Sequence, residues 1–158
     1  VDNLPRKKIA QRILPIASVP GQLVTAGSDR GLSIGSDNTN RYRAYVEAAE
    51  AIDTARLAGF YVRLYPLFQQ AYVELGYPHG YFNDRLVEVI EHLLAAPEPK
   101  SPIYLSQPKV MFEFNDRDLE ELSAGQKILV RVGFDNELRL KAKLREIRKA
   151  VTAQPVNR

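Results

Sequence analysis

The feature that most constrains the fold is a long stretch of helical periodicity that begins at Thr54. Between that residue and Gly76, apolar side chains recur every three or four positions, a spacing that places them on one face of an α-helix. The positions in this stripe are Leu57, Tyr61, Leu64, Phe68, Ala71 and Leu75. We therefore predict a long helix that buries the stripe, with Tyr65 outside it and a kink at Pro66 on the opposite face.

Further helices are predicted on both sides of this one. The segment "RYRAYVEAAEAI" has helical spacing and ends near Asp53, and "DRLVEVIEHLLAA" begins another helix with Asn83 or Asp84 as its cap. Three more helix starts come later in the chain, at Asn115-Asp116, at Ser123 in capping-box spacing, and at Asp135, just after Gly133 has ended the preceding helix. The last helix is expected to turn Leu138, Ala142, Leu144 or Arg145, and Ile147 toward the core and its basic residues outward.

Two regions favour strands rather than helices. The segment "QLVTAGSDRGLSIG" predicts a β-hairpin with strands near 22–26 and 31–35, and "IYLSQPKVMFEF" predicts two short strands that extend its sheet. The fold class is therefore α+β, mainly helical with a small antiparallel sheet. We expect a single domain over residues 1–158, divided into an N-terminal arm (1–20), a hairpin (21–36), helices (40–96), strands (101–114) and helices (116–152).

Composition excludes several kinds of chemistry. The chain has no cysteine, which excludes disulfides, thiol catalysis and cysteine-bound metals. No apolar run approaches the roughly 20 residues that span a bilayer, and the first residues lack the apolar core of a signal peptide. Because the sequence begins with Val1, we expect it to be a piece of a longer gene product.

The string "GLSIG" at 31–35 matches the G-x-S-x-G pattern of a serine nucleophile. That motif requires a strand, a sharp turn and then a helix, whereas the next residues here, "SDNTN", do not predict a helix start. We interpret the string as the second strand of the hairpin.

Metal or cofactor binding has little support in the sequence. His79 and His92 are the only histidines, and neither lies in a metal-ligand spacing. Glu88 and His92 are four positions apart on a helix and are expected to form a solvated pair. We therefore predict no catalytic residues, no metal and no cofactor.

The C-terminal end is strongly basic. Residues 139–158 contain seven basic residues and one acidic residue, whereas residues 31–138 contain 10 basic and 16 acidic ones. Such a helix can bind an anionic membrane surface or nucleic acid, but it lacks aromatic residues for base stacking, and we expect no nucleic acid partner. The favoured interpretation is a solvated face or a contact with the acidic middle of the chain.

A dense cluster of tyrosines and polar groups surrounds the string "LGYPHGYFNDRL" at 75–86. Gly76 is a helix stop, and Pro78 with Gly80 shapes a turn, so about half of the string has a structural role. The remaining side chains, together with one arginine on the preceding helix, are our candidates for binding a ligand or partner: Arg63, Tyr77, His79, Tyr81 and Arg85.

The strings "VDNLPR", "GYFNDRL" and "LSAGQK" resemble an uncharacterised proteobacterial family, domain of unknown function 3014, over nearly the whole chain. The resemblance implies a cell-envelope protein with an N-terminal membrane anchor, a proline-rich linker and this domain in the periplasm. It implies no activity and no catalytic residues. A cytoplasmic location is not excluded by the residues themselves.

These observations lead to one main hypothesis and two alternatives. The main one is a non-catalytic envelope domain that binds an unidentified protein through the 77–85 corner and Arg63. We expect it to be attached to the membrane only by a segment outside this sequence. Formation of a homo-oligomer is possible. The first alternative is a small-ligand or glycan site, or an enzyme, that uses Glu113, Asp84 and His79. The second is anionic-surface binding by the last helix.

Overall fold

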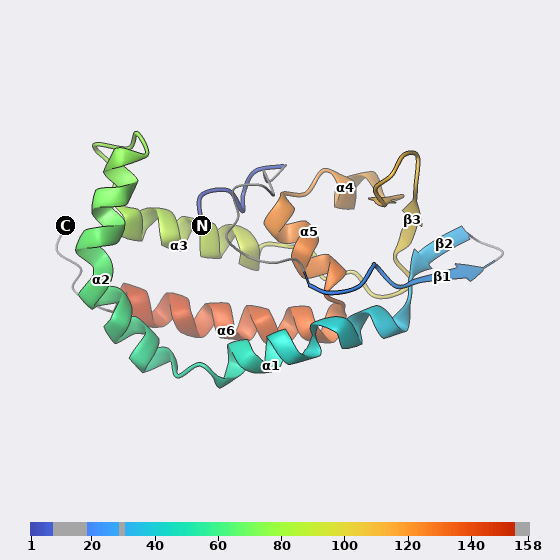
Figure 1. Cartoon of the computed structure of the whole chain (residues 1–158), viewed down its shortest axis with the longest axis horizontal. Helices are drawn as coiled ribbons and strands as arrows, with labels where there is room; N and C mark the ends of the chain where they lie inside the picture. Colours follow the sequence, from blue (N-terminus) through green and yellow to red (C-terminus); the bar gives the residue numbers. More distant parts are fainter. Residues whose placement is uncertain (8–18, 29–30, 154–158) are drawn as a thin grey trace.

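The computed structural model describes residues 1–7, 19–28 and 31–153. It confirms a mainly helical α+β fold with a small antiparallel sheet (Figure 1). In chain order the elements are β1 (Thr25–Ser28), β2 (Gly31–Ile34), the 3₁₀ helix η2 (Ser36–Tyr42), α1 (Arg43–Ala51), α2 (Thr54–Glu74), α3 (Phe82–Leu94), β3 (Tyr104–Ser106), β4 (Glu113–Phe114), α4 (Arg117–Glu120), α5 (Ala124–Arg131) and α6 (Phe134–Thr152).

The sheet lies at one end of the molecule (Figure 1). Its order in the described part of the chain is β1-β2-β3-β4, and each neighbouring pair is antiparallel, so the predicted hairpin and its extension by two short strands are confirmed. Leu105 of β3 is opposite Leu32 of β2 and Phe114 of β4. These apolar side chains continue into a core that also contains Ile103, Leu119 and Val130.

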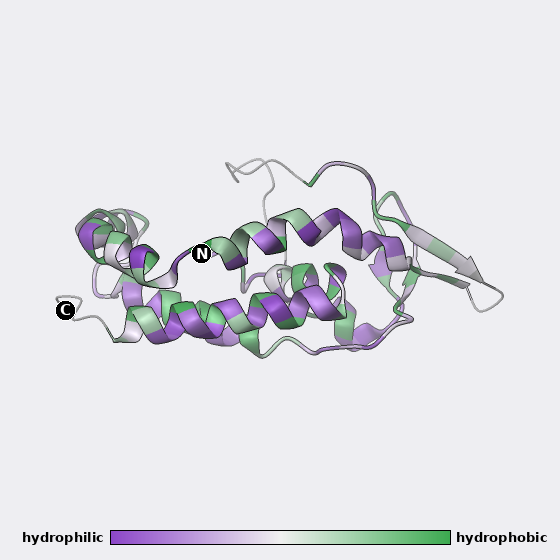
Figure 2. Cartoon of the chain, turned by 90° about the horizontal axis from the view of Figure 1, so that it is seen from below, coloured by the Kyte–Doolittle hydropathy of each residue, from purple (hydrophilic) through white to green (hydrophobic). Residues whose placement is uncertain are grey.

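The helices are organised around α6, which packs against α1, α2, α3 and α5. Seen from below, α1 and α6 lie side by side and the hairpin projects beyond them at one end (Figure 2). A second core lies between α3 and α5 and consists of Val89, Leu93, Ala96 and Leu129. The predicted starts at Asp116 and Ser123 are confirmed as helix caps, whereas α6 begins at Phe134 with Gly133 as its cap, just before the predicted Asp135.

The predicted face of α2 is wrong in part, although the helix itself is confirmed. Its buried residues are Ala58, Tyr65 and Tyr72, whereas Phe68 and Leu75 of the predicted stripe are 38% and 72% exposed. Most of the circumference of α2 is apolar, so periodicity alone could not select the side that packs. Tyr65 lies on the packed side, where its hydroxyl donates to Gln69 Oε1 of the same helix at 3.1 Å.

The orientation predicted for α6 is also wrong in part. Leu138 is 37% exposed and Ala142 is exposed, whereas Lys141 is fully buried and Lys143 is 8% exposed. Because four other helices surround α6, positions that a two-layer arrangement would leave in water become interior. The long lysine stems reach polar acceptors there: Lys141 Nζ donates to the carbonyl of Ala96, and Lys143 Nζ donates to the carbonyl of Ile52, each at 2.5 Å.

The string "GLSIG" forms a strand, as interpreted, but the prediction that no helix starts directly after it is wrong. The 3₁₀ helix η2 begins immediately after Gly35. Ser33 nevertheless lies within β2 rather than at a turn, and its hydroxyl donates to the carbonyl of Ala26 across the hairpin at 3.4 Å. This serine is therefore part of the sheet and does not have the exposed position of a nucleophile.

The N-terminal arm is described at its two ends. Residues 1–7 lie over α3 and α5, to which they are joined by hydrogen bonds and an ion pair. Residues 8–18, the rest of the predicted arm, lie outside the described residues.

Candidate functional site

The corner between α2 and α3 is held by side chains of α2. Gly76, with a positive φ of 101°, ends the helix, as predicted. Gln69 then spans the turn: its Nε2 donates to the carbonyl of Gly80, and its Oε1 accepts from the backbone N–H of Phe82, both at 2.8 Å. Asn83 and Asp84 were predicted to cap α3, but the cap position is Tyr81 and Gln69 satisfies the first amide instead.

An aromatic ladder fills the space between the two helices. Tyr61 stacks on Phe68, which stacks on Phe82, and Tyr72 stacks on Tyr77 with ring centroids 4.5 Å apart. The Tyr61 hydroxyl donates to Asn83 Oδ1 at 3.0 Å. Burial raises the pKa of both Tyr61 and Tyr72, so these hydroxyls stay protonated.

Two of the five predicted binding residues meet at the N-terminal arm. Arg85 forms an ion pair with Asp2 at 2.8 Å and a second with Glu88 at 2.8 Å, and the Tyr77 hydroxyl donates to Asp2 Oδ2 at 3.4 Å. Burial by itself would raise the pKa of Asp2, but the hydrogen bonds and charges of Arg85 and Arg6 outweigh it and lower this pKa. Arg85 and Tyr77 therefore hold the arm in place.

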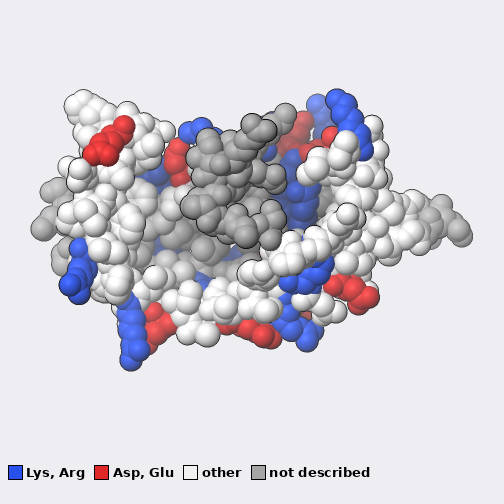
Figure 3. Space-filling model, viewed as in Figure 1, with Lys and Arg blue, Asp and Glu red and all other residues white. Residues whose placement is uncertain are grey.

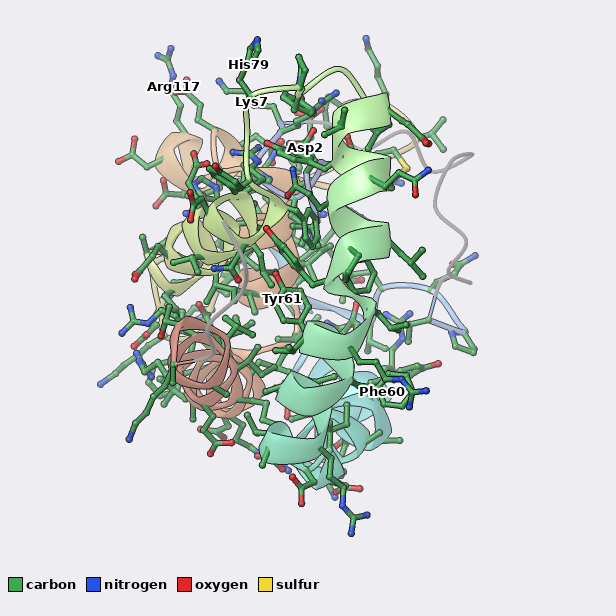
Figure 4. All side chains as sticks on the ribbon, turned by 90° about the vertical axis from the view of Figure 1, so that its left-hand side faces the viewer. Asp2, Lys7, Phe60, Tyr61, His79 and Arg117 are labelled. Carbon is green, nitrogen blue, oxygen red and sulfur yellow. The ribbon has the colours of Figure 1, made fainter. Side chains whose placement is uncertain are left out.

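The other three predicted residues lie apart. His79 projects from the turn into solvent (Figure 4), Tyr81 is 43% exposed, and Arg63 is exposed on α2. Two of the five predicted binding residues therefore contact the N-terminal arm, and the other three lie on the surface. The role of all five in binding stays a prediction.

The N-terminal arm also accepts hydrogen bonds from the first backbone N–H groups of α5. The carbonyl oxygens of Leu4 and Arg6 accept from the N–H groups of Gly125 and Ala124, at 2.9 and 2.8 Å. A side chain at Gly125 would lie 2.6 Å from Leu93 and 3.1 Å from the Leu4 carbonyl, so only glycine permits this approach. Consequently the three strings behind the family resemblance, at 1–6, 80–86 and 122–127, lie together in the fold. The sequence showed each string but not that they meet.

A pocket of about 330 Å³ lies beside this junction. Within it, His92 Nε2 lies 2.8 Å from Ser123 Oγ, so the expected pair of His92 with Glu88 is wrong. The residues that line the pocket are Pro5, Lys7, His92, Asp118, Glu121, Leu122, Ser123 and Gln126.

A serine beside a histidine suggests nucleophilic catalysis, which also requires donors for the oxyanion. The amides that could supply them at this helix start are occupied: those of Ala124 and Gly125 by the arm, and that of Gln126 by Ser123 Oγ at 3.3 Å. Gln126 Oε1 in turn accepts from the Ser123 amide, which completes a capping box. The geometry therefore gives Ser123 the role of a helix cap.

A row of exposed apolar side chains lies along α2. We use the name outer face for six positions spaced three or four residues apart along it: Leu57, Phe60, Leu64, Leu67, Ala71 and Leu75. Phe60 is 63% exposed, Leu67 62% and Leu75 72%. Phe60 points away from the rest of the molecule, whereas Tyr61 points toward α3 and α6 (Figure 4). Periodicity had found most of this stripe but assigned it to the core.

The basic residues of α6 mostly contact acidic residues of the same chain. Arg139 pairs with Glu50 at 2.5 Å, Arg148 pairs with Glu91, and Lys141 pairs with Glu98 at 2.8 Å. The favoured interpretation, contact with the acidic middle of the chain, is therefore confirmed for these three. Because these three basic side chains are paired within the chain, fewer cations of α6 are available to bind an anionic surface. Such binding stays a prediction.

The remaining polar candidates do not form a site together. Glu113 is exposed on β4, and Asp84 is exposed in the first turn of α3, where it complements the helix dipole. Among the described residues, no group of three or more histidine, aspartate or glutamate side chains could hold a metal ion. No helix in the same residues is long and apolar enough to cross a membrane.

Comparison with known proteins supports the resemblance carried by the three strings. Residues 1–148 match the family described as "Protein of unknown function (DUF3014)". A comparison with curated proteins and one with solved structures each found no match.

Proposed function

Because the chain belongs to the DUF3014 family, whose description gives no activity, we propose from its surface that it is a protein-interaction domain that binds through the outer face of α2. The observation that carries this proposal is the exposure of Phe60, Leu67 and Leu75 on one side of one helix. Apolar surface in water is unfavourable by roughly 25 cal/mol per Å². A contiguous patch of a few hundred Å² or more is typical of an interaction site.

The surroundings of the outer face support the same proposal. Phe60 and Leu67 are 63% and 62% exposed, while the opposite side of α2 is anchored by the buried Tyr65 and Tyr72. The face is thus presented on a rigid helix, and a rigid apolar stripe loses little entropy when it binds.

Site-specific photo-crosslinking in cells tests this proposal with the full-length protein. A photoreactive phenylalanine analogue at Phe60 or Leu67 should give discrete adducts that an added Leu64→Asp substitution abolishes. The matched control is the same probe at Val110, which is 85% exposed on the turn between β3 and β4, far from α2 in sequence. Equal adducts from Val110, or none from α2, would contradict the proposal.

We further propose, on the family resemblance, that the interaction takes place in the cell envelope, with the domain on the periplasmic side of the inner membrane. The test is protease treatment of spheroplasts that contain the full-length protein. The domain should be digested without lysis and should sediment with the membrane fraction. Protection until lysis, or recovery in the cytosolic fraction, would overturn this location.

A further inference from the structure

We propose that the partner of the outer face is a second copy of this chain, with the two α2 helices packed antiparallel about a two-fold axis. This inference rests on the proposed function and adds the identity of the partner. Three features of α2 carry it: the distribution of its charges, the order of its large and small side chains, and the apolar residues at its two ends.

The charges of α2 are separated along its length. Arg56 and Arg63 lie in the N-terminal half, Glu74 lies at the C-terminal end, and no other acidic or basic residue occurs in the helix. The surface over α2 is correspondingly mostly uncharged, with acidic atoms toward its upper end and basic atoms toward its lower end (Figure 3).

This arrangement leaves Arg56 without a close ion pair among the described residues. A helix dipole favours acidic residues near the N-terminus and basic residues near the C-terminus; Asp53 supplies an acidic cap at the start of α2, but Arg56 and Glu74 lie at the ends that the dipole disfavours for them. The ion-pair contact of Arg56 within the described residues is with Asp53 at 3.9 Å, and the Arg56 side chain is 90% exposed. An antiparallel second copy would place Arg56 of each chain near Glu74 of the other and bring the opposed dipoles together, which is favourable.

The apolar side chains of the outer face also complement those of a second, antiparallel copy of α2. With the two-fold axis placed midway between Leu64 and Leu67, Phe60 of each chain is opposite Ala71 of the other, and Leu64 is opposite Leu67. A large side chain then meets a small one, as knobs do in the holes of a coiled coil. A parallel pair would instead place Phe60 on Phe60 and Arg56 on Arg56.

Both ends of the outer face continue the apolar contact. Leu57, near the start of the helix, is 37% exposed, and Leu75, just after its end, is 72% exposed. The same two-fold axis brings Leu57 of one chain near Leu75 of the other. An interface of about three turns on each side of the axis is small, so we expect a reversible dimer with a dissociation constant of about 1–100 μM.

Sedimentation equilibrium of the full chain is the first test. The mass should rise with concentration from 17.8 kDa toward twice that value. Leu67→Glu should keep the monomer mass at all concentrations, whereas Val110→Glu, also at an exposed apolar position, should leave dimerisation unchanged. Circular dichroism checks that both variants are folded. A wild-type mass of one chain up to millimolar concentration would overturn the inference.

A charge exchange tests the orientation. Glu74→Arg should weaken the dimer about tenfold by placing two arginines together, and the double variant Arg56→Glu with Glu74→Arg should restore it. Failure of the double variant to recover affinity contradicts the antiparallel arrangement.

Cysteine cross-linking gives an independent reading, since the chain has no cysteine of its own. Mixed Phe60→Cys and Ala71→Cys proteins should form a disulfide between them on mild oxidation with copper–phenanthroline, while Phe60→Cys alone should not. Disulfides of Phe60→Cys with itself would indicate a parallel pair and overturn the inference. If the chain is monomeric but face-specific adducts to another protein persist in cells, the proposed function survives and the second copy is excluded.

Discussion

Arg85 and Asp2 form an ion pair across 83 positions of sequence, with Arg85 Nη2 2.8 Å from Asp2 Oδ1 and Arg85 Nε donating to the same oxygen at 2.9 Å. The two side chains are 21% and 25% exposed, so water screens the pair only in part. The pair joins the first residues of the chain to the start of α3. Because Leu4 and Arg6 then cap α5, one short segment connects two helices.

Removing the charge of Asp2 should loosen this connection. We expect Asp2→Asn to lower the free energy of unfolding by about 1–2 kcal/mol, because Arg85 then retains only Glu88 as an ionised partner. Urea unfolding followed by circular dichroism measures the change. The control is Arg6→Ala, since Arg6 also contacts Asp2 but is 59% exposed, and its effect should stay below about 0.5 kcal/mol. Equal effects would show that the pair with Arg85 has no special role.

The contribution of Asp2 should depend on pH in one direction. Its pKa in the folded chain is below the ordinary value of 3.8, so the unfolded chain binds the proton first as the solution is acidified. The stabilisation is therefore present above about pH 3.8 and is lost as the pH falls through the lowered value. The difference between wild type and Asp2→Asn should accordingly be constant near neutrality and shrink below about pH 4. A difference that persists at pH 2 would assign the effect to packing instead.

The cap of α5 gives a separate prediction. Ser123→Ala should destabilise the domain by about 1–2 kcal/mol, because Ser123 is 6% exposed and its loss leaves the Gln126 amide and His92 without their partner. Thermal unfolding is the measurement. Asp116→Ala removes the cap of α4, a single exposed turn, and should cost less. The interpretation of Ser123 as a cap fails if its removal leaves the melting temperature unchanged.

Two aromatic residues of α2 should differ sharply in their effect on stability. Tyr65→Ala should cost about 3–5 kcal/mol because the ring is 6% exposed, whereas Phe60→Ala should change stability by less than about 0.5 kcal/mol because 63% of Phe60 is exposed. Denaturant unfolding at a concentration where the chain is monomeric separates these values from any effect of dimerisation. A large loss for Phe60→Ala would mean that the outer face packs within the chain.

The buried Lys141 should be among the costliest residues to replace. Its Nζ lies 3.1 Å from Glu137 Oε1, and Glu137 is only 1% exposed. Burial raises the pKa of Glu137, and the hydrogen bond and charge of Lys141 oppose that rise. Lys141→Ala should therefore destabilise the domain by about 3–5 kcal/mol near pH 8, because it leaves a buried carboxylate without its cation.

Lys141→Ala should destabilise the domain less at acidic pH than near pH 8. As the pH is lowered, Glu137 of the variant takes up a proton more readily than an ordinary glutamate, because burial raises its pKa and Lys141 no longer opposes that rise, so the unpaired charge disappears and part of the stability returns. The control is Lys149→Ala at an exposed position without an ion pair among the described residues, which should be neutral at both pH values. An effect of Lys141→Ala that is independent of pH would attribute the loss to its packed stem alone.

Local signals in the sequence located the elements well. The capping box of Ser123 with Gln126, the stop at Gly76 and the hairpin ending at Gly35 were each predicted from neighbouring residues, because caps and turns are decided by side chains within a few positions. The same signals failed for the start of α3, where Gln69 from another helix satisfies the first amide. A cap supplied from a distance leaves no local pattern.

The sequence by itself determined that α2 is a helix, that its surface is apolar around much of its circumference, and that its charges are separated end to end. Only the tertiary structure decided which apolar side is covered: Tyr65 and Tyr72 are buried, with Tyr72 packed edge-on against Phe82 of α3, while Phe60 and Leu67 are 63% and 62% exposed. The tertiary structure likewise placed Asp2 beside Arg85 and buried Lys141. Such contacts join residues far apart in the chain, and their geometry depends on how whole helices pack.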